Sequence, residues 1–329
     1  EIPFVLPFQE RAKVFSYMIQ QDKASRPEAH VYSHRVSIRR SFLVEDAFAQ
    51  LNPLGPRLKD HLRVEFIDQF GLPEAGVDGG GLLRDMLTKL VQGVFDPRFG
   101  LFKTTTAGLH FPNPSQVLLS NERLEQFKFA GRVLGKSLYE NILVELPLAN
   151  FFLDKLLGKE NSGSPLNDLF FLDPILYKNL RSLKTCDVSE LDLDFTVSET
   201  DLGETRTIEL IPSGAEIAVT EANKLRYISA VADYHINMKT RVQSQAFLAG
   251  LSEIINPLWL KLFNQQELQF ILSGSPLGID VADWRANTSY SGGYSDSDQT
   301  IQWLWEVVEE MSPQDQHALL MFATGCSRP

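Results

Sequence analysis

Cysteine is scarce in this chain. Its 329 residues include two cysteines, Cys186 and Cys326. Two thiols cannot build a disulfide framework or a four-thiolate metal site. Because low cysteine usage is typical of proteins kept in a reducing compartment, we expect a cytoplasmic and/or nuclear location.

Long apolar runs and an excess of positive charge are also missing. No stretch approaches the roughly 18 apolar residues of a membrane span. The N-terminus, EIPFVLPFQER, lacks the basic start and long apolar core of a signal peptide. The formal net charge is −11, whereas nucleic acids and anionic membrane surfaces are bound by clustered Lys and Arg. We therefore expect neither nucleic acid nor a membrane as a partner.

Motifs that would hold a metal or a nucleotide are incomplete. His30 and His34 stand four positions apart, but no carboxylate follows at metal-site spacing, so we expect no metal. The string from Gly131 to Ser137, GRVLGKS, resembles a P-loop, yet its glycines are one residue too close and it lies within a helical period. A nucleotide hydrolase would rest on this string alone, and we expect no cofactor. Gly131 and Gly135 instead share one helix face, where small residues allow close approach of another element.

Helical periodicity dominates the chain, and it is interrupted between residues 174 and 234. Residues 121–146 carry the longest helical signal and predict the central core helix, and another long helix is expected over 221–250. Apolar residues make up 43% of the chain, as in an ordinary globular protein.

The interrupting segment combines helix and strand patterns. PILYKNLRSL predicts a helix, TRTIELI a strand, and Thr220 the N-cap of a further helix. One set of apolar residues alternates with polar ones, as in a half-buried strand: Leu191, Leu193, Phe195 and Val197. The predicted fold class is therefore α+β, mainly helical.

The C-terminal part differs in composition from the rest. Residues 273–284, SGSPLGIDVADW, have the Gly, Pro and Ser content of a linker and are the best hinge candidate. From Asp283 onward there are seven acidic and two basic residues. The chain begins at Glu1 and stops at Pro329 directly after an apolar helix-like run, so we expect it to be a fragment of a longer protein.

Many stretches of this chain resemble the HECT domain of ubiquitin ligases. They follow the family's order over nearly the whole chain: AGVDGGGLLRDML, LFKTTTAGLHFPNP, FAGRVLGKSLYENILVELPLANFFLDKLLG, LDPILYKNL, LDLDFTV, IAVTEANKLRYISAVADY, SYSGGYS, IQWLWEVV and LLMFATGCSRP. ENILVELPLANFFL and CSRP are most similar to the C-type ubiquitin-protein ligase branch, outside the branch that carries WW domains.

The resemblance implies a bilobal HECT fold. Residues 1–277 would form a helical N-lobe, in which a small α+β subdomain, residues 166–234, docks a ubiquitin-conjugating enzyme. Residues 278–282 would be the hinge, and residues 283–329 the start of an α/β C-lobe that is truncated before the catalytic cysteine.

The family's contact positions for the conjugating enzyme map onto matching motifs of this sequence. They are Leu176, Asn179, Leu180, Leu191, Leu193, Tyr227 and Val231. Leu176 and Leu180 share a helix face, as Tyr227 and Val231 do. An apolar groove of this kind receives the aromatic or aliphatic anchors of a partner. Phe195 is interpreted as a core residue.

The resemblance also implies a reaction. Ubiquitin would pass from the conjugating enzyme's cysteine to a C-lobe cysteine thiolate, and then to a lysine of a protein substrate. The family places this nucleophile in a Leu-Pro-x-x-x-Thr-Cys-Phe/Met-Asn motif, which is absent; neither Cys186 nor Cys326 matches it. We expect the catalytic cysteine beyond Pro329 and this chain to be inactive alone. The alternative is a non-catalytic scaffold that binds the conjugating enzyme.

Overall fold

Helices make up most of the protein. The computed structural model describes residues 3–26, 33–74, 81–159, 164–201, 203–274 and 279–324. The α-helices of these ranges are α1 (Phe8–Ala24), α2 (Leu43–Leu51), α3 (Gly81–Phe95), α4 (Asn121–Tyr139), α5 (Asn150–Leu156), α6 (Pro165–Leu172), α7 (Pro174–Leu183), α8 (Lys224–Asp233), α9 (Arg241–Ile254), α10 (Pro257–Leu260), α11 (Gln265–Ser273), α12 (Val281–Ala286), α13 (Gln299–Glu310) and α14 (Pro313–Thr324). None of them combines the length and the apolar composition that crossing a bilayer requires.

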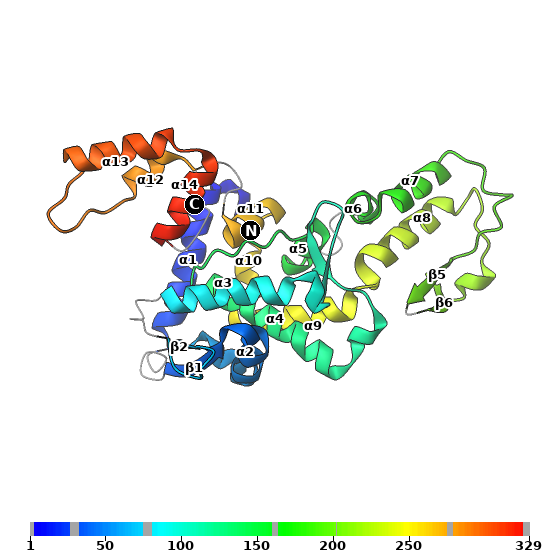
Figure 1. The fold of residues 1–329 in the computed structure, drawn as a ribbon. Helices are drawn as coiled ribbons and strands as arrows, with labels where there is room; N and C mark the ends of the chain where they lie inside the picture. The colour runs from blue at the N-terminus through cyan, green and yellow to red at the C-terminus, as the bar shows by residue number, and fades with distance from the viewer. Residues whose placement is uncertain are drawn as a thin grey trace.

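The strands form small two-stranded sheets. Strands β1 (Ser33–Arg39) and β2 (His61–Ile67) pair in parallel, whereas β3 (Phe102–Thr104) with β4 (His110–Pro112) and β5 (Thr196–Asp201) with β6 (Glu204–Glu209) are antiparallel. The α+β, mainly helical fold class is confirmed. Figure 1 shows that α6, α7, β5, β6 and α8 extend from one side of the helical body. We call this group, residues 165–233, the lateral unit.

The body is built on the contact between α4 and α9. Glycines make this contact close: a Cβ on Gly250 would lie 1.8 Å from the carbonyl oxygen of Lys128, and one on Gly131 would lie 2.0 Å from that of Phe247. The close approach predicted for the glycine face of this helix is thus confirmed. Lys136 of the P-loop-like string is 0% exposed within α4, where no phosphate could reach it.

Aromatic side chains fill the space beside this helix pair. Phe95 stacks on Phe102 with ring centroids 4.1 Å apart, and Phe152 meets Phe247 edge to face at 5.3 Å. All four are buried. Such pairs add about 0.5–1.5 kcal/mol each beyond their buried area, so this cluster joins α3, α5 and α9 into one core.

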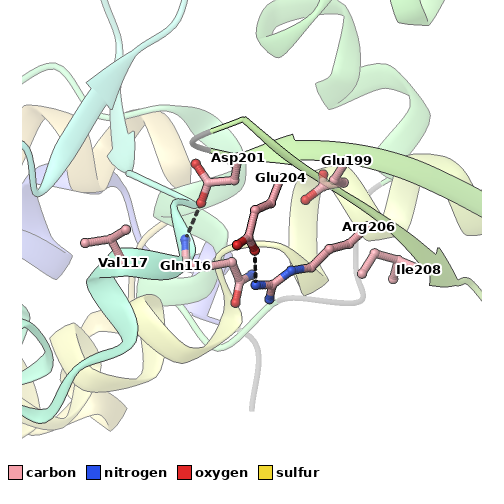
Figure 2. A pocket seen from close by; sticks show the side chains of 7 residues that line it. All are labelled: Gln116, Val117, Glu199, Asp201, Glu204, Arg206 and Ile208. Atoms are coloured by element: carbon pink, nitrogen blue, oxygen red, sulfur yellow. Dashed lines mark hydrogen bonds and ion pairs between the residues drawn. The ribbon is translucent and has the colours of Figure 1, made fainter.

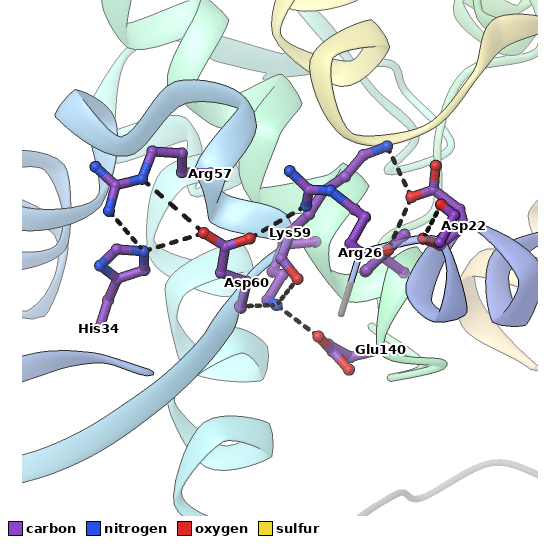
Figure 3. Close-up of polar contacts among 10 residues, drawn as sticks. Asp22, Arg26, His34, Arg57, Lys59, Asp60 and Glu140 are labelled. Atoms are coloured by element: carbon purple, nitrogen blue, oxygen red, sulfur yellow. Dashed lines mark hydrogen bonds and ion pairs between the residues drawn. The ribbon is translucent and has the colours of Figure 1, made fainter. Parts of the chain in front are cut away.

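Helix α1 is fastened at both ends. Near its start, the Arg11 guanidinium donates to both carboxylate oxygens of Glu267 at 2.7 and 2.6 Å, and to the Leu262 carbonyl oxygen at 2.6 Å. Near its end, Asp22 accepts hydrogen bonds from Lys59 at 2.9 Å and from the Tyr139 hydroxyl at 2.8 Å. Figure 3 shows this second group of charges.

Two helix predictions were wrong in extent. The central helix ends at Tyr139 and not at 146, because Asn141 adopts a positive φ of 52°, a conformation that Asn tolerates and a helix cannot continue through. The helix expected over 221–250 is divided: α8 begins at Lys224, not after Thr220, and a π-helix, η8 (Tyr234–Met238), separates it from α9.

The strand expected over residues 191–197 is shorter than its alternation suggested. Ladder pairing begins at Thr196, and Asp192 has a positive φ of 48° that breaks an extended strand. Phe195 is 1% exposed, which confirms its interpretation as a core residue.

The division into lobes stays a prediction. Of the expected hinge, residues 278–282, Gly278 lies outside the described residues, and Val281 and Ala282 already belong to α12. Cys326 also lies outside them.

Candidate docking surface

Helix α7 carries the first group of predicted contact residues, and its start is well defined. The Asp173 carboxylate accepts hydrogen bonds from the backbone N–H of Ile175 at 3.1 Å and of Leu176 at 2.9 Å. Pro174 occupies the first turn, where its missing N–H is not needed. The packing of α7 gives it an inward side: Leu180 is 3% exposed and Leu176 half-buried, whereas Asn179 is exposed.

The segment from Leu191 to Phe195 lies between α7 and α8 in sequence and is held by backbone bonds. The Leu193 carbonyl accepts from the N–H of Val219 at 2.7 Å, and Phe195 exchanges bonds with Gly214 and Leu210 at 3.0 and 2.8 Å. Leu193 is half-buried, whereas Leu191 is 46% exposed. Leu191 is therefore the more exposed of these two leucines, and Leu193 lies deeper in the lateral unit.

Helix α8 supplies the remaining predicted residues, Tyr227 and Val231, and both are buried at 8% and 2% exposure. The Tyr227 ring packs edge to face on Phe195 at 5.5 Å. Burial, and then the negative charge of Asp194, raise the pKa of the Tyr227 phenol. The Tyr227 phenol therefore stays neutral, as its burial requires.

Lys224 ties α8 to the loop after α7. Its ammonium donates to the Cys186 carbonyl at 2.9 Å and pairs with Glu221 at 2.7 Å, and Glu221 also accepts the backbone N–H of Val188 at 3.0 Å. These bonds, the pairing with Lys224 first, lower the pKa of Glu221. They hold the loop that carries Cys186, whose thiol is exposed and does not match the catalytic motif of the family.

The predicted residues thus form a graded surface and not a uniform one. Leu180, Tyr227 and Val231 are buried, Leu176 and Leu193 half-buried, and Asn179 and Leu191 exposed. Sequence reasoning missed further exposed apolar side chains of the lateral unit: Phe170 at 50%, Phe171 at 43% and Ile175 at 74%. Ile175 stands one turn before Asn179, on the same flank of α7. The run FFLDPI contains more apolar residues than one buried face needs, which was the available signal.

The described residues also lack the ligand cluster that a metal site requires. They contain no group of three or more His, Cys, Asp or Glu side chains placed to hold a metal ion.

Comparison with known proteins identifies the class. The HECT-domain (ubiquitin-transferase) family matches residues 88–329, and the chain belongs to this family.

Particular relatives support the assignment over the whole chain. The chain is 38% identical to the E3 ubiquitin-protein ligase UPL6 of Arabidopsis thaliana over 332 residues, covering 100% of this chain and 32% of that protein. It is 36% identical to ubiquitin-protein ligase E3B of Homo sapiens, with the same two coverages. It is 38% identical to the E3 ubiquitin-protein ligase HUL5 of Saccharomyces cerevisiae, covering 99% of this chain and 37% of that protein. The chain therefore spans about a third of the length of these relatives.

Proposed function

We propose that the lateral unit docks a ubiquitin-conjugating enzyme, and that the whole protein is a HECT-type ubiquitin ligase. The observation that carries the proposal is the position of the motif residues: they lie on α7, on residues 191–193 and on α8 of one small unit, in which α7 packs against α8. We place the protein nearest the C-type branch, and we assign residues 1–277 to the N-lobe and 283–329 to the start of the C-lobe.

In this proposal the partner inserts an apolar anchor between α7 and α8. Leu176, Leu193 and Tyr227 form the floor that receives it. Asn179 and Leu191 form the rim, where an exposed amide and an exposed leucine can be covered by the partner. Burial of one large side chain contributes about 1.5–3 kcal/mol, which suits a contact that must release the enzyme after each transfer.

Ubiquitin transfer would follow docking. The thioester on the conjugating enzyme is attacked by a cysteine thiolate of the ligase, and the conjugating enzyme leaves as a thiolate, so the acyl group stays activated. The nucleophile is expected after Pro329 in the whole protein. The second product is an isopeptide bond to a substrate lysine. Ubiquitin and protein substrates are therefore the further partners that we propose.

Transfer is tested with the whole protein and a conjugating enzyme charged with labelled ubiquitin. We expect a ubiquitin adduct that dithiothreitol removes, and none on the 329-residue chain alone. A whole protein that binds the enzyme but forms no reducible adduct would instead support the alternative, a non-catalytic scaffold.

Docking is tested by changing the rim and not the floor. We expect Leu191→Asp to weaken binding of the conjugating enzyme by about tenfold or more, with an unchanged melting temperature, because this leucine is 46% exposed. The matched control is Leu225→Asp on the far face of α8, where the leucine is 62% exposed. Isothermal titration measures both. Equal affinity of the two variants would contradict the assignment.

A further inference from the structure

The lateral unit shares the apolar core of the body near α6, whereas its hairpin reaches the body through polar contacts. Asp201, the last residue of β5, accepts hydrogen bonds from the Ser115 hydroxyl at 3.0 Å and from the backbone N–H of Gln116 at 2.9 Å. Both donors stand at the start of a short 3₁₀ helix of the body, η6 (Gln116–Leu119). The bonds from Gln116 and then Ser115 lower the pKa of Asp201, so the carboxylate is charged at neutral pH.

A second contact of the same strand reaches the π-helix that joins α8 to α9. Glu199 pairs with Lys239 at 2.5 Å. Burial, and then the charge of Glu199, raise the pKa of Tyr234. Asp201 and Glu199 are two positions apart on β5 and so share one face of the hairpin. That face is turned toward the body.

The π-helix is itself held from the body side. Lys155 of α5 is 4% exposed. Its ammonium donates to the carbonyl oxygens of Ile236 at 3.2 Å and Asn237 at 3.3 Å, and to the Thr240 hydroxyl at 3.0 Å. These bonds fix the helical connection between the lateral unit and α9. They do not fix the hairpin, which reaches the body through its own side chains.

Between the hairpin and η6 the packing is open. A cavity of about 270 Å³ separates them, lined by Gln116, Val117, Glu199, Asp201, Glu204, Arg206 and Ile208. Figure 2 shows Asp201 reaching Gln116 across this space, while Glu204 pairs with Arg206 inside the hairpin. Because apolar packing does not fill the space between the hairpin and η6, the position of the hairpin there depends on the hydrogen bonds of Asp201. Small, polar contacts between units allow relative motion by default.

We propose that Asp201 is a positioning residue. Its bonds to Ser115 and Gln116 hold the lateral unit at one orientation to the body, and so determine where a docked conjugating enzyme is presented. The consequence for transfer rests on the proposed docking function, whereas the orientation itself does not. Asp201 lies on the hairpin, away from the predicted contact residues on α7 and α8. Its loss therefore changes the orientation of the lateral unit and not its affinity for a partner.

Spin labels measure the orientation directly. In a background with Cys186→Ser and Cys326→Ser, labels are attached at Glu125→Cys on α4 and Ser229→Cys on α8, both exposed positions. Wild type is expected to give one narrow distance distribution. Asp201→Ala is expected to add a second population of label-to-label distances. The ratio of molecules in this second population to molecules with the wild-type distance should rise about tenfold, since hydrogen bonds to a charged group are lost. Ser115→Asp is expected to act similarly, by repelling Asp201.

The matched control is Glu204→Ala, which removes a carboxylate from the same hairpin and cavity without touching η6. It is expected to leave the distance distribution unchanged. Asp201→Asn retains one oxygen acceptor and is expected to restore part of the narrow distribution. Identical distributions in wild type and Asp201→Ala would overturn the proposal, as would equal broadening in Glu204→Ala.

Binding and transfer separate positioning from docking. We expect the Kd of the conjugating enzyme for Asp201→Ala to stay within about twofold of wild type. In the whole protein, single-turnover transfer is expected to slow severalfold at saturating enzyme. A loss of affinity equal to the loss of transfer would contradict positioning. If the conjugating enzyme did not bind the wild-type protein, the docking function would be refuted. The distance measurement would still test whether Asp201 sets the orientation of the lateral unit.

Discussion

Replacing Gly250 by alanine lowers the free energy of unfolding by about 3 kcal/mol or more. The new Cβ would lie 1.8 Å from the Lys128 carbonyl oxygen and 2.7 Å from its carbon. These are backbone atoms in the middle of α4, so no rotamer change relieves the overlap. Helices α4 and α9 must move apart, which disturbs the packing on both of their sides. Urea unfolding followed by circular dichroism measures the change.

Gly81→Ala is the matched control for this prediction. Gly81 begins α3, and a Cβ there would have no neighbour within 4 Å. We expect its unfolding free energy to change by less than about 0.5 kcal/mol. A loss below about 1 kcal/mol for Gly250→Ala would show that the two helices adapt to the extra methyl group, against the rigid contact described above.

Glu140→Ala is expected to destabilise the protein by about 3–5 kcal/mol, because it leaves a buried ammonium unpaired. The Lys136 side chain is 0% exposed and contacts Glu140 at 2.5 Å. Its other acceptors are the backbone carbonyls of Asp60 at 3.0 Å and Lys59 at 3.5 Å. Carbonyl dipoles cannot replace a full negative charge, so the cation loses its main compensation for desolvation.

The effect should depend on pH with a definite sign. Burial lowers the pKa of Lys136 in the folded protein even with Glu140 present. The unfolded chain therefore binds more protons at this site, and its contribution to stability rises with pH up to the ordinary lysine value. Removing the carboxylate lowers this pKa further. The unfolding free energy of Glu140→Ala should hence recover more steeply than that of wild type as the pH increases from neutral.

Two comparisons test this explanation. The double variant Lys136→Met with Glu140→Ala should be more stable than Glu140→Ala alone, because no unpaired charge remains. Glu10→Ala breaks the exposed pair with Lys13, whose side chains are 73% and 53% exposed, and should cost less than about 0.5 kcal/mol. A double variant less stable than the single one would assign the loss to packing and not to charge.

Periodicity predicted which residues lie together, but not how deep they lie. The spacing of Gly131 and Gly135 correctly indicated a close helix contact, because it depends only on the period of one helix. The alternation from Leu191 to Val197 was misleading in extent, since the continuous β5–β6 ladder begins only at Thr196 and Asp194 makes an isolated bridge to Ala218. The positive φ of Asn141 ends the central helix early, and that of Asp192 interrupts the alternation. Both residue types tolerate that conformation.

The candidate surface shows the same limit. Motifs selected seven residues, all of which belong to the lateral unit, yet Leu180 is 3% and Leu191 46% exposed. Both are leucines in apolar patterns, and only the packing of the lateral unit shows that one is buried and the other exposed. For this reason a charge at Leu180 would test folding, whereas a charge at Leu191 tests binding. The hydrogen bond from Ser115 to Asp201 joins residues that are 86 positions apart, which no local sequence pattern could predict.

The fastening of α1 has a consequence in time. Arg11 depends on Glu267, which follows it by 256 residues. At about 5–20 residues per second, a ribosome needs tens of seconds to supply that partner. During this interval the inward face of α1, including Phe15 and Ile19, has no α11 to close over its start. Helix α1 is thus secured only after α11 has been made, and until Glu267 emerges its inward apolar face is open to aggregation.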